Sequence, residues 1–210
     1  MNTKVKICGI TRLDDALCAA DAGASAIGFI LVKNGPRYVS ADNVRSIVRE
    51  IPPFVTPVGV FAESPRSEVL ATVAKSGIRA VQLHGEEEMK EFYDFPVPVY
   101  RVFRVSVEFK PEILRRYKGT AFMLDTFKEG VAGGTGRTLD WNIAIEAKKY
   151  GRLILSGGIN PENVGDAIHR VAPYAIDVSS GVESSPGVKD HGKIRKLFAA
   201  IRKAENEIGG

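Results

Sequence analysis

Residues 5–11 read VKICGIT: a short apolar, β-branched run ends on Cys8, and Gly9 leads into a segment with helical spacing. Seven further runs of this kind follow, at 26–31 (AIGFIL), 57–62 (PVGVFA), 80–85 (AVQLHG), 97–103 (VPVYRVF), 121–126 (AFMLDT), 153–158 (LILSGG) and 175–181 (AIDVSSG). Most of the segments between them are amphipathic, and helix-start signals occur at Thr11, Ser40, Ser64 and Asn160. The pattern predicts a strand followed by a helix, repeated along the chain.

This repeat requires a parallel sheet with right-handed crossovers, and two architectures provide one. A doubly wound dinucleotide fold would carry GxGxxG after its first strand, and CGITRL at 8–13 lacks it. GGTGR at 133–137 is neither that fingerprint nor a Walker loop. Eight units are enough to close a sheet. We therefore predict an α/β fold made of a single (β/α)8 TIM barrel over residues 1–210, with the weakest pattern at 97–117.

Charge and cysteine content narrow the class of protein. Lys and Arg number 29 against 25 Asp and Glu, a net charge of +4 without a basic block, so we expect no nucleic-acid partner. The N-terminal MNTKVKIC lacks a signal-peptide core, and no apolar run approaches the roughly 20 residues of a spanning helix. Cys8 and Cys18 do not have the spacing of a disulfide scaffold. We expect a soluble, cytoplasmic protein with no membrane partner, of open oligomeric state.

Polar and glycine residues gather where the predicted strands end. In a barrel of this type the active site is built at those ends. The residues that fall there are Cys8, Arg37, His84, Asp125, Gly157, Gly158, Asp177, Ser179, Ser180 and Gly181. Histidines at 84, 169 and 191 lack the spacing of metal ligands, so we expect neither a metal nor a cofactor.

The same stretches resemble a known family. KICGIT, GPRYVS, VQLHGEE, LDT, GGTGRTLDW, LSGGINPENV, DVSSGVE and PGVKDH occur in an order similar to that of phosphoribosylanthranilate isomerase, the Amadori-rearrangement enzyme of tryptophan biosynthesis. The resemblance covers almost the whole chain. Two positions depart from the family pattern: Gly35 replaces a small polar residue before Pro-Arg, and Leu139 replaces Phe in Phe-Asp-Trp. Neither change affects a proposed proton-transfer group.

The resemblance implies a phosphorylated small-molecule substrate and particular roles. Cys8 would be the general base and Asp125 the general acid, while Arg37 would hold the anthranilate carboxylate. The loops at Gly157-Gly158 and Ser180-Gly181 would bind the phosphate, with His84 and Asp177 lining the same site.

Physical chemistry sets conditions on these roles. An unperturbed thiol has a pKa near ~8.5, so Cys8 needs nearby positive charge to act as a base, and Lys6 and Arg37 are candidates. Asp125 needs a pKa raised above ~3.9, by burial or a neighbouring anion, to remain an acid. Each residue also has a purely structural interpretation when it is considered alone. Cys8 could be a buried apolar side chain, and Asp125 could cap or salt-bridge a neighbouring loop. Arg37 could form a surface ion pair, and the glycines could belong to ordinary turns.

Strand parity yields one further hypothesis. Lys6 lies one layer below Cys8, and Asp177 lies one layer below Ser179 on the strand that would neighbour it in a closed barrel. We expect Lys6 and Asp177 to form a buried ion pair that biases Cys8 toward thiolate, the alternative being that they face different layers. The loop at 128–138 is either a lid over the substrate or a plain connection.

Three other functions compete. The analogous isomerase of histidine biosynthesis, or one that serves both pathways, has an aspartate where this chain has Cys8. A sugar-phosphate aldolase needs a Schiff-base lysine, for which Lys6 lies too deep and Lys128 too far into a loop. A noncatalytic phosphate-ligand sensor would keep the glycine loops but could dispense with Cys8 and Asp125.

Overall fold

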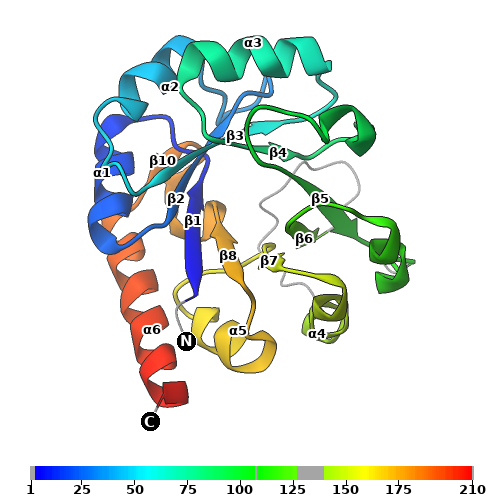
Figure 1. Ribbon diagram of the computed structural model, residues 1–210. Helices are drawn as coiled ribbons and strands as arrows, with labels where there is room; N and C mark the ends of the chain where they lie inside the picture. Colours follow the sequence, from blue (N-terminus) through cyan, green and yellow to red (C-terminus); the bar gives the residue numbers. More distant parts are fainter. Residues whose placement is uncertain (1–2, 107, 127–139, 210) are drawn as a thin grey trace.

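The eight apolar runs form the strands of a closed parallel barrel. The computed structural model describes residues 3–106, 108–126 and 140–209, and its strands pair in chain order from the first around to the eighth (Figure 1). They are β1 (Lys4–Cys8), β2 (Ala26–Ile30), β3 (Thr56–Phe61), β4 (Ala80–Leu83), β5 (Val99–Val105), β6 (Phe122–Thr126), β7 (Leu153–Leu155) and β8 (Ala175–Val178). The predicted TIM barrel is confirmed.

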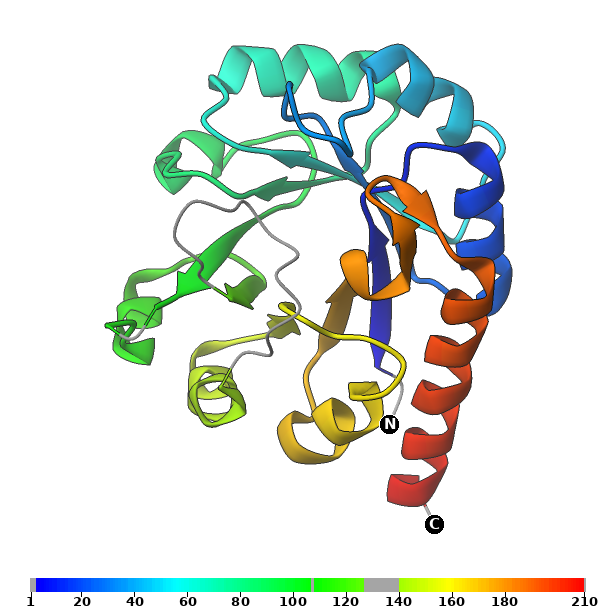
Figure 2. The same ribbon diagram turned by 180° about the vertical axis from the view of Figure 1, so that it is seen from behind.

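Helices surround this barrel, with a small hairpin added after β8 (Figures 1 and 2). They are α1 (Leu13–Ala22), α2 (Ala41–Val48), α3 (Arg66–Ser76), α4 (Trp141–Ala147), α5 (Val164–Val171) and α6 (His191–Gly209). Short 3₁₀ helices are η1 (Met89–Phe92), η2 (Pro111–Arg116), η3 (Lys148–Tyr150) and η4 (Ser180–Val182), and the hairpin pairs β9 (Glu183–Ser185) with β10 (Val188–Lys189). None of the helices in these ranges is long and apolar enough to cross a membrane.

The helix expected after the fifth strand is absent, and this prediction was wrong. The connections after β4 and β5 are the 3₁₀ helices η1 and η2. Both are short: η1 buries Phe92, and η2 buries Pro111 and Leu114. Prolines at 96, 98 and 111 interrupt a longer amphipathic pattern, since proline cannot donate within a helix.

The helix-start signals had mixed outcomes. The Ser40 hydroxyl accepts a hydrogen bond from the Asn43 amide and caps α2 as predicted. Thr11 does not cap α1, because its hydroxyl donates instead to the carbonyl of Gly187 at 2.6 Å. That bond ties the loop after β1 to the β9–β10 hairpin, and both lie at the end of the barrel where the strands finish.

The core has two parts. A large apolar cluster fills the space between the strands and the surrounding helices. A smaller cluster lies inside the barrel and consists of Val58, Tyr100, Val102, Met123, Ile154 and Ala175. Residues two apart face the same side of a strand. The residues two positions after these inward ones therefore point into the barrel mouth.

Candidate active site

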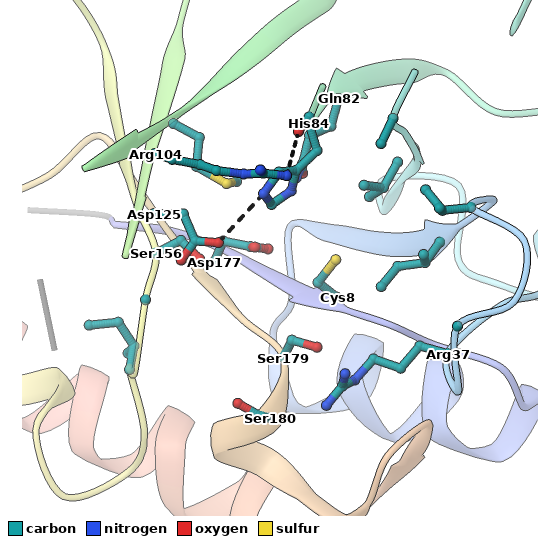
Figure 3. Close-up of a pocket in the computed structure, with 18 of the residues that line it drawn as sticks. Cys8, Arg37, Gln82, His84, Arg104, Asp125, Ser156, Asp177, Ser179 and Ser180 are labelled. Atoms are coloured by element: carbon teal, nitrogen blue, oxygen red, sulfur yellow. Dashed lines mark hydrogen bonds and ion pairs between the residues drawn. The ribbon is translucent and has the colours of Figure 1, made fainter. Parts of the chain in front are cut away.

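One pocket of about 240 Å³ opens where the strands end (Figure 3). The sequence-predicted residues that line it are Cys8, Arg37, His84, Asp125, Gly157, Gly158, Asp177, Ser179 and Ser180. Only Gly181, of the predicted set, is not part of the lining. Residues from all eight strands or the loops that follow them thus meet in a cavity of a size suited to a small molecule.

Cys8 ends β1 with its side chain in the pocket and 5% of its surface exposed. It pairs with Gly28 of β2, where an added Cβ would lie 2.8 Å from the Cys8 sulfur and 2.8 Å from Lys6 Cε. Gly28 therefore provides the space that the thiol occupies. Sequence reasoning missed this glycine because its role depends on a neighbour across the sheet.

Burial raises the pKa of the Cys8 thiol above its ordinary value. The ammonium groups of Lys6 and Lys189 act in the opposite direction and lower this pKa, whereas Asp177 raises it. The expected influence of Lys6 is present, but burial outweighs it. Lys6 thus acts on Cys8 in the expected direction, toward thiolate, while the net upward shift of the pKa leaves the thiol protonated at neutral pH.

Asp125 lies across the pocket, near the end of β6, and is 8% exposed. One carboxylate oxygen accepts the amide hydrogen of Thr126 at 2.8 Å, and the other lies 3.9 Å from Nε2 of His84. Burial, followed by the negative charge of Asp177, raises the pKa of Asp125 to about 6. A carboxyl group in this range can donate a proton near neutral pH.

His84 follows β4 and faces Asp125 (Figure 3). Burial, aided by the positive charge of Arg104, lowers the pKa of His84 to about 4. The imidazole is therefore neutral at pH 7, and its contact with Asp125 is not an ion pair. Arg104 also donates to the backbone carbonyl of His84 at 3.2 Å.

A polar layer lies directly beneath the pocket. Lys6 Nζ donates to Asp177 Oδ1 at 2.8 Å and to Gln82 Oε1 at 2.9 Å, and the Tyr100 hydroxyl donates to the same Gln82 oxygen at 3.0 Å. The ion pair expected from strand parity is thus present, with both side chains at least nine-tenths buried. Burial alone would lower the pKa of Lys6, but Asp177 raises it above its usual range, so the ammonium stays charged.

Arg37 reaches the pocket from the loop after β2 and is already engaged. Its Nε and Nη2 donate to the two carboxylate oxygens of Glu183 at 2.9 and 2.7 Å. Lys189 binds the same carboxylate at 2.8 Å. This three-residue cluster was not foreseen, because its members lie 146 and 6 positions apart in the sequence.

The loops after β7 and β8 pack tightly against one another. Gly157 and Gly158 have φ of 87° and 70°, in the left-handed region that favours glycine. A Cβ on Gly181 would lie only 2.0 Å from the carbonyl oxygen of Ile159. Gly181 therefore packs against the loop after β7 without lining the cavity, while Gly157, Gly158 and Ser180 line it.

The comparisons with known proteins agree with this geometry. Residues 5–200 match the model of the N-(5'-phosphoribosyl)anthranilate isomerase family. The chain belongs to this family. The isomerase of Citrifermentans bemidjiense is 46% identical over 201 residues, which covers 96% of this chain and 98% of that protein.

Solved structures of the isomerase family have the same architecture. The enzyme of Thermotoga maritima has a TM-score of 0.89 and 41% identity, covering 98% of this chain and all of that one. Another structure of the isomerase is a complex with reduced 1-(o-carboxyphenylamino)-1-deoxyribulose 5-phosphate. It has a TM-score of 0.86 and 39% identity, and covers 96% of this chain and all of its own.

Two polar pocket residues of this isomerase were missed. Arg104 lines the cavity from β5, the strand with the weakest sequence pattern, although parity with the inward-facing Val102 could have placed it there. Ser156 also lines it. The buried Ser179 hydroxyl has no hydrogen-bond partner among the described residues, so it is free to meet a ligand.

The remaining expectations have different outcomes. The loop at 128–138 and Leu139 fall outside the described residues, so the lid hypothesis is not tested. Among residues 3–106, 108–126 and 140–209, no group of three or more His, Cys, Asp or Glu side chains could hold a metal ion.

Proposed function

We propose that this chain converts N-(5'-phosphoribosyl)anthranilate into 1-(2-carboxyphenylamino)-1-deoxyribulose 5-phosphate, with Cys8 as general base and Asp125 as general acid. The observation that carries the proposal is the placement of a thiol and a carboxyl of raised pKa in one pocket, on β1 and β6. The same pocket offers a cationic group at Arg37 and the turns after β7 and β8, lined by Gly157, Gly158 and Ser180. These features match a substrate with one carboxylate and one phosphate.

The reaction needs two proton transfers. Asp125 protonates the ring oxygen of the aminoribose while the nitrogen lone pair forms a C=N bond, and the ring opens. Cys8, as thiolate, removes the proton from C2, and the electron pair of that C–H bond neutralises the iminium to give an enolamine. The enolamine then tautomerises to the ketone. No electron acceptor or cofactor is consumed, because the carbon oxidised and the carbon reduced belong to the same molecule.

The two ends of the substrate would bind on opposite sides of the reacting carbons. The phosphate fits the turns after β7 and β8, where Gly157, Gly158 and Ser180 line the cavity, a common phosphate position in barrels. The ring carboxylate fits Arg37, because guanidinium groups bind carboxylates through paired hydrogen bonds. Both cysteines are free thiols, which suits a reducing compartment, and we place the enzyme in the cytoplasm with its substrate.

The first experiment measures turnover directly. Purified protein is mixed with freshly made phosphoribosylanthranilate, and the loss of anthranilate-type fluorescence is followed, with Cys8→Ser and Asp125→Asn alongside. We expect turnover by the parent chain and a fall in kcat of at least about a hundredfold in each variant, since each loses one proton-transfer group. Parent protein that binds the reduced product analogue without turnover would instead identify a noncatalytic phosphate-ligand-binding barrel.

A further inference from the structure

Arg37 is held along one edge of its guanidinium group. Glu183 accepts hydrogen bonds from Nε at 2.9 Å and from Nη2 at 2.7 Å, which is the bidentate arrangement typical of a strong arginine–carboxylate pair. The Arg37 side chain is 17% exposed and that of Glu183 is 5% exposed. Within the described part of the chain, Nη1 makes no hydrogen bond. One edge of the guanidinium is therefore fixed by Glu183, and Nη1 is left for a ligand of the pocket that Arg37 lines (Figure 3).

Lys189 completes the cluster from the other side. Its fully buried ammonium lies 2.8 Å from Glu183 Oε1 and donates to the carbonyl of Ser179 at 3.2 Å. Burial alone would raise the pKa of Glu183, but the hydrogen bonds from Arg37 and the charge of Lys189 lower it, so this carboxylate stays ionised. Two cations and one anion leave a net charge of +1. A single negative charge in the pocket would neutralise it.

The backbone of the hairpin also holds Glu183 in place. Glu183 begins the β9–β10 hairpin, and the amide of Gly187 in its turn also donates to Glu183 Oε1, at 3.3 Å. Gly187 has φ of 82°, and a Cβ there would lie 2.8 Å from the carbonyl oxygen of Pro36, next to Arg37. The hairpin therefore packs directly on the loop that carries Arg37. An arginine that only anchored this hairpin would not need to line the cavity.

We propose that Glu183 is the positioning residue for the aromatic end of the substrate: it holds the Nε and Nη2 edge of Arg37, so that Nη1 is presented to one aryl carboxylate. This inference rests on the proposed function and goes beyond it, because it names the residue that makes the site selective for a carboxylated ring. Glu183 itself does not touch the substrate. Its effect depends on the ring carboxylate and not on the phosphate or the sugar.

The test compares two ligands by calorimetric titration. One is reduced 1-(o-carboxyphenylamino)-1-deoxyribulose 5-phosphate, and the other is the same compound with an unsubstituted phenyl ring. Glu183→Gln replaces one acceptor oxygen by a donor, so Arg37 is no longer held by two bonds. We expect this variant to bind the carboxylated ligand about tenfold more weakly, or worse, and the phenyl ligand within about twofold of the parent chain. In an Arg37→Ala background, Glu183→Gln should have no further effect.

Asp15→Asn is the matched control. Asp15 is a buried carboxylate that accepts from the backbone amide of Lys189 at 3.1 Å and contacts His191 at 2.9 Å, so it supports the same hairpin without touching Arg37. Any loss in this variant should be equal for the two ligands. If Glu183→Gln does not fold, Glu183→Asp carries the test, because it keeps the charge for Lys189 but is one methylene too short to reach both partners.

The possible outcomes separate this inference from the proposed function. Equal weakening of both ligands by Glu183→Gln, or an unchanged preference for the carboxylated ligand, overturns the role of Glu183 even when the parent chain turns over phosphoribosylanthranilate. A parent chain that neither turns over this substrate nor prefers the carboxylated ligand overturns both.

Discussion

Cys8 and Asp125 hold their protons in the opposite arrangement from the one that the reaction uses. At pH 7 the thiol is protonated, and Asp125, with a pKa of about 6, is mostly ionised. The reactive form has the same number of protons, with one of them moved from sulfur to the carboxyl. Because one group must be ionised and the other protonated, this pair yields a bell-shaped pH profile. We expect kcat/KM to rise near pH 6 and to fall above the ordinary range of a thiol.

Lys6 is the residue through which this profile can be shifted. Its ammonium lowers the pKa of Cys8, so Lys6→Met should move the alkaline limb of kcat/KM to higher pH and lower the plateau by a similar factor. Breaking a buried ion pair also costs stability, about 3–5 kcal/mol, because Asp177 is left without its partner. The measurements are the pH dependence of kcat/KM and the urea unfolding curve of the same preparation.

Tyr100→Phe is the control for Lys6→Met. It removes a hydroxyl from the same buried layer, the one that donates to Gln82, without changing any charge. Its pH profile should keep the limbs of the parent chain. An alkaline limb that stays in place in Lys6→Met, or moves equally in Tyr100→Phe, would show that the charge of Lys6 does not act on Cys8.

At the level of elements, the turns after β7 and β8 depend on each other. A Cβ on Gly181 would lie 2.0 Å from the Ile159 carbonyl oxygen, and backbone atoms at that distance must move apart. Gly181→Ala should therefore destabilise the protein by about 1–3 kcal/mol, the usual cost of overpacking. It should also raise KM by displacing the turn at Gly157 and Gly158, with a smaller change in kcat because neither proton-transfer group moves.

Gly165→Ala provides the comparison within the neighbouring helix α5. A Cβ there has ordinary space, with its nearest neighbour, Ala204 Cβ, 3.9 Å away, and alanine favours a helix by roughly 0.8–1.0 kcal/mol over glycine. This variant should be slightly more stable than the parent chain and have the same KM. The measurements are steady-state kinetics and thermal unfolding of the two variants. An unchanged KM in Gly181→Ala would show that this glycine does not affect substrate binding.

Elements that follow from a local sequence pattern could be predicted from the sequence. Most contacts between elements far apart in the chain could not. The strands follow from local apolar runs, and the residues that end them follow from barrel geometry. Even the Lys6–Asp177 pair followed, because parity and closure of β1 on β8 are regular. Glu183 lies in an irregular hairpin after β8, where no periodicity indicates which way a side chain points. The 3₁₀ helices η1 and η2 were missed because segments of four and six residues are too short to show a helical period.

Across the whole molecule, closure of the barrel determines the electrostatics of the site. Asp177 of β8 lies beside Lys6 of β1, 171 positions away in the chain, because the first and eighth strands pair with each other where the barrel closes. The charge of Asp177 then raises the pKa of Asp125, while burial lowers the pKa of His84 to about 4. Folding thus shifts two neighbouring groups in opposite directions relative to their unfolded values of about 3.9 and 6.5.

These two shifts affect stability with opposite sign. The unfolded chain binds a proton at His84 between about pH 6.5 and pH 4 and the native protein does not, so this group destabilises the fold as the pH falls through that window. Asp125 binds its proton near pH 6 in the native protein but only near pH 3.9 when unfolded, so it stabilises the fold as the pH falls below 6. Between pH 7 and pH 5 the contributions largely cancel.

Removing one of the two groups should make the contribution of the other to the pH dependence of stability measurable. We expect Asp125→Asn to lose about 1 kcal/mol more than the parent chain between pH 7 and pH 5, because the His84 contribution is then unopposed. His84→Gln should instead gain about 2 kcal/mol relative to the parent over the same interval, because the destabilising His84 contribution is removed and only that of Asp125 remains. Free energies of unfolding from urea titrations at pH 5, 6 and 7 provide the measurement. Parallel pH dependences in all three proteins would mean that neither pKa is shifted by folding, and Asp125 would then be too acidic in the native protein to serve as the proton donor.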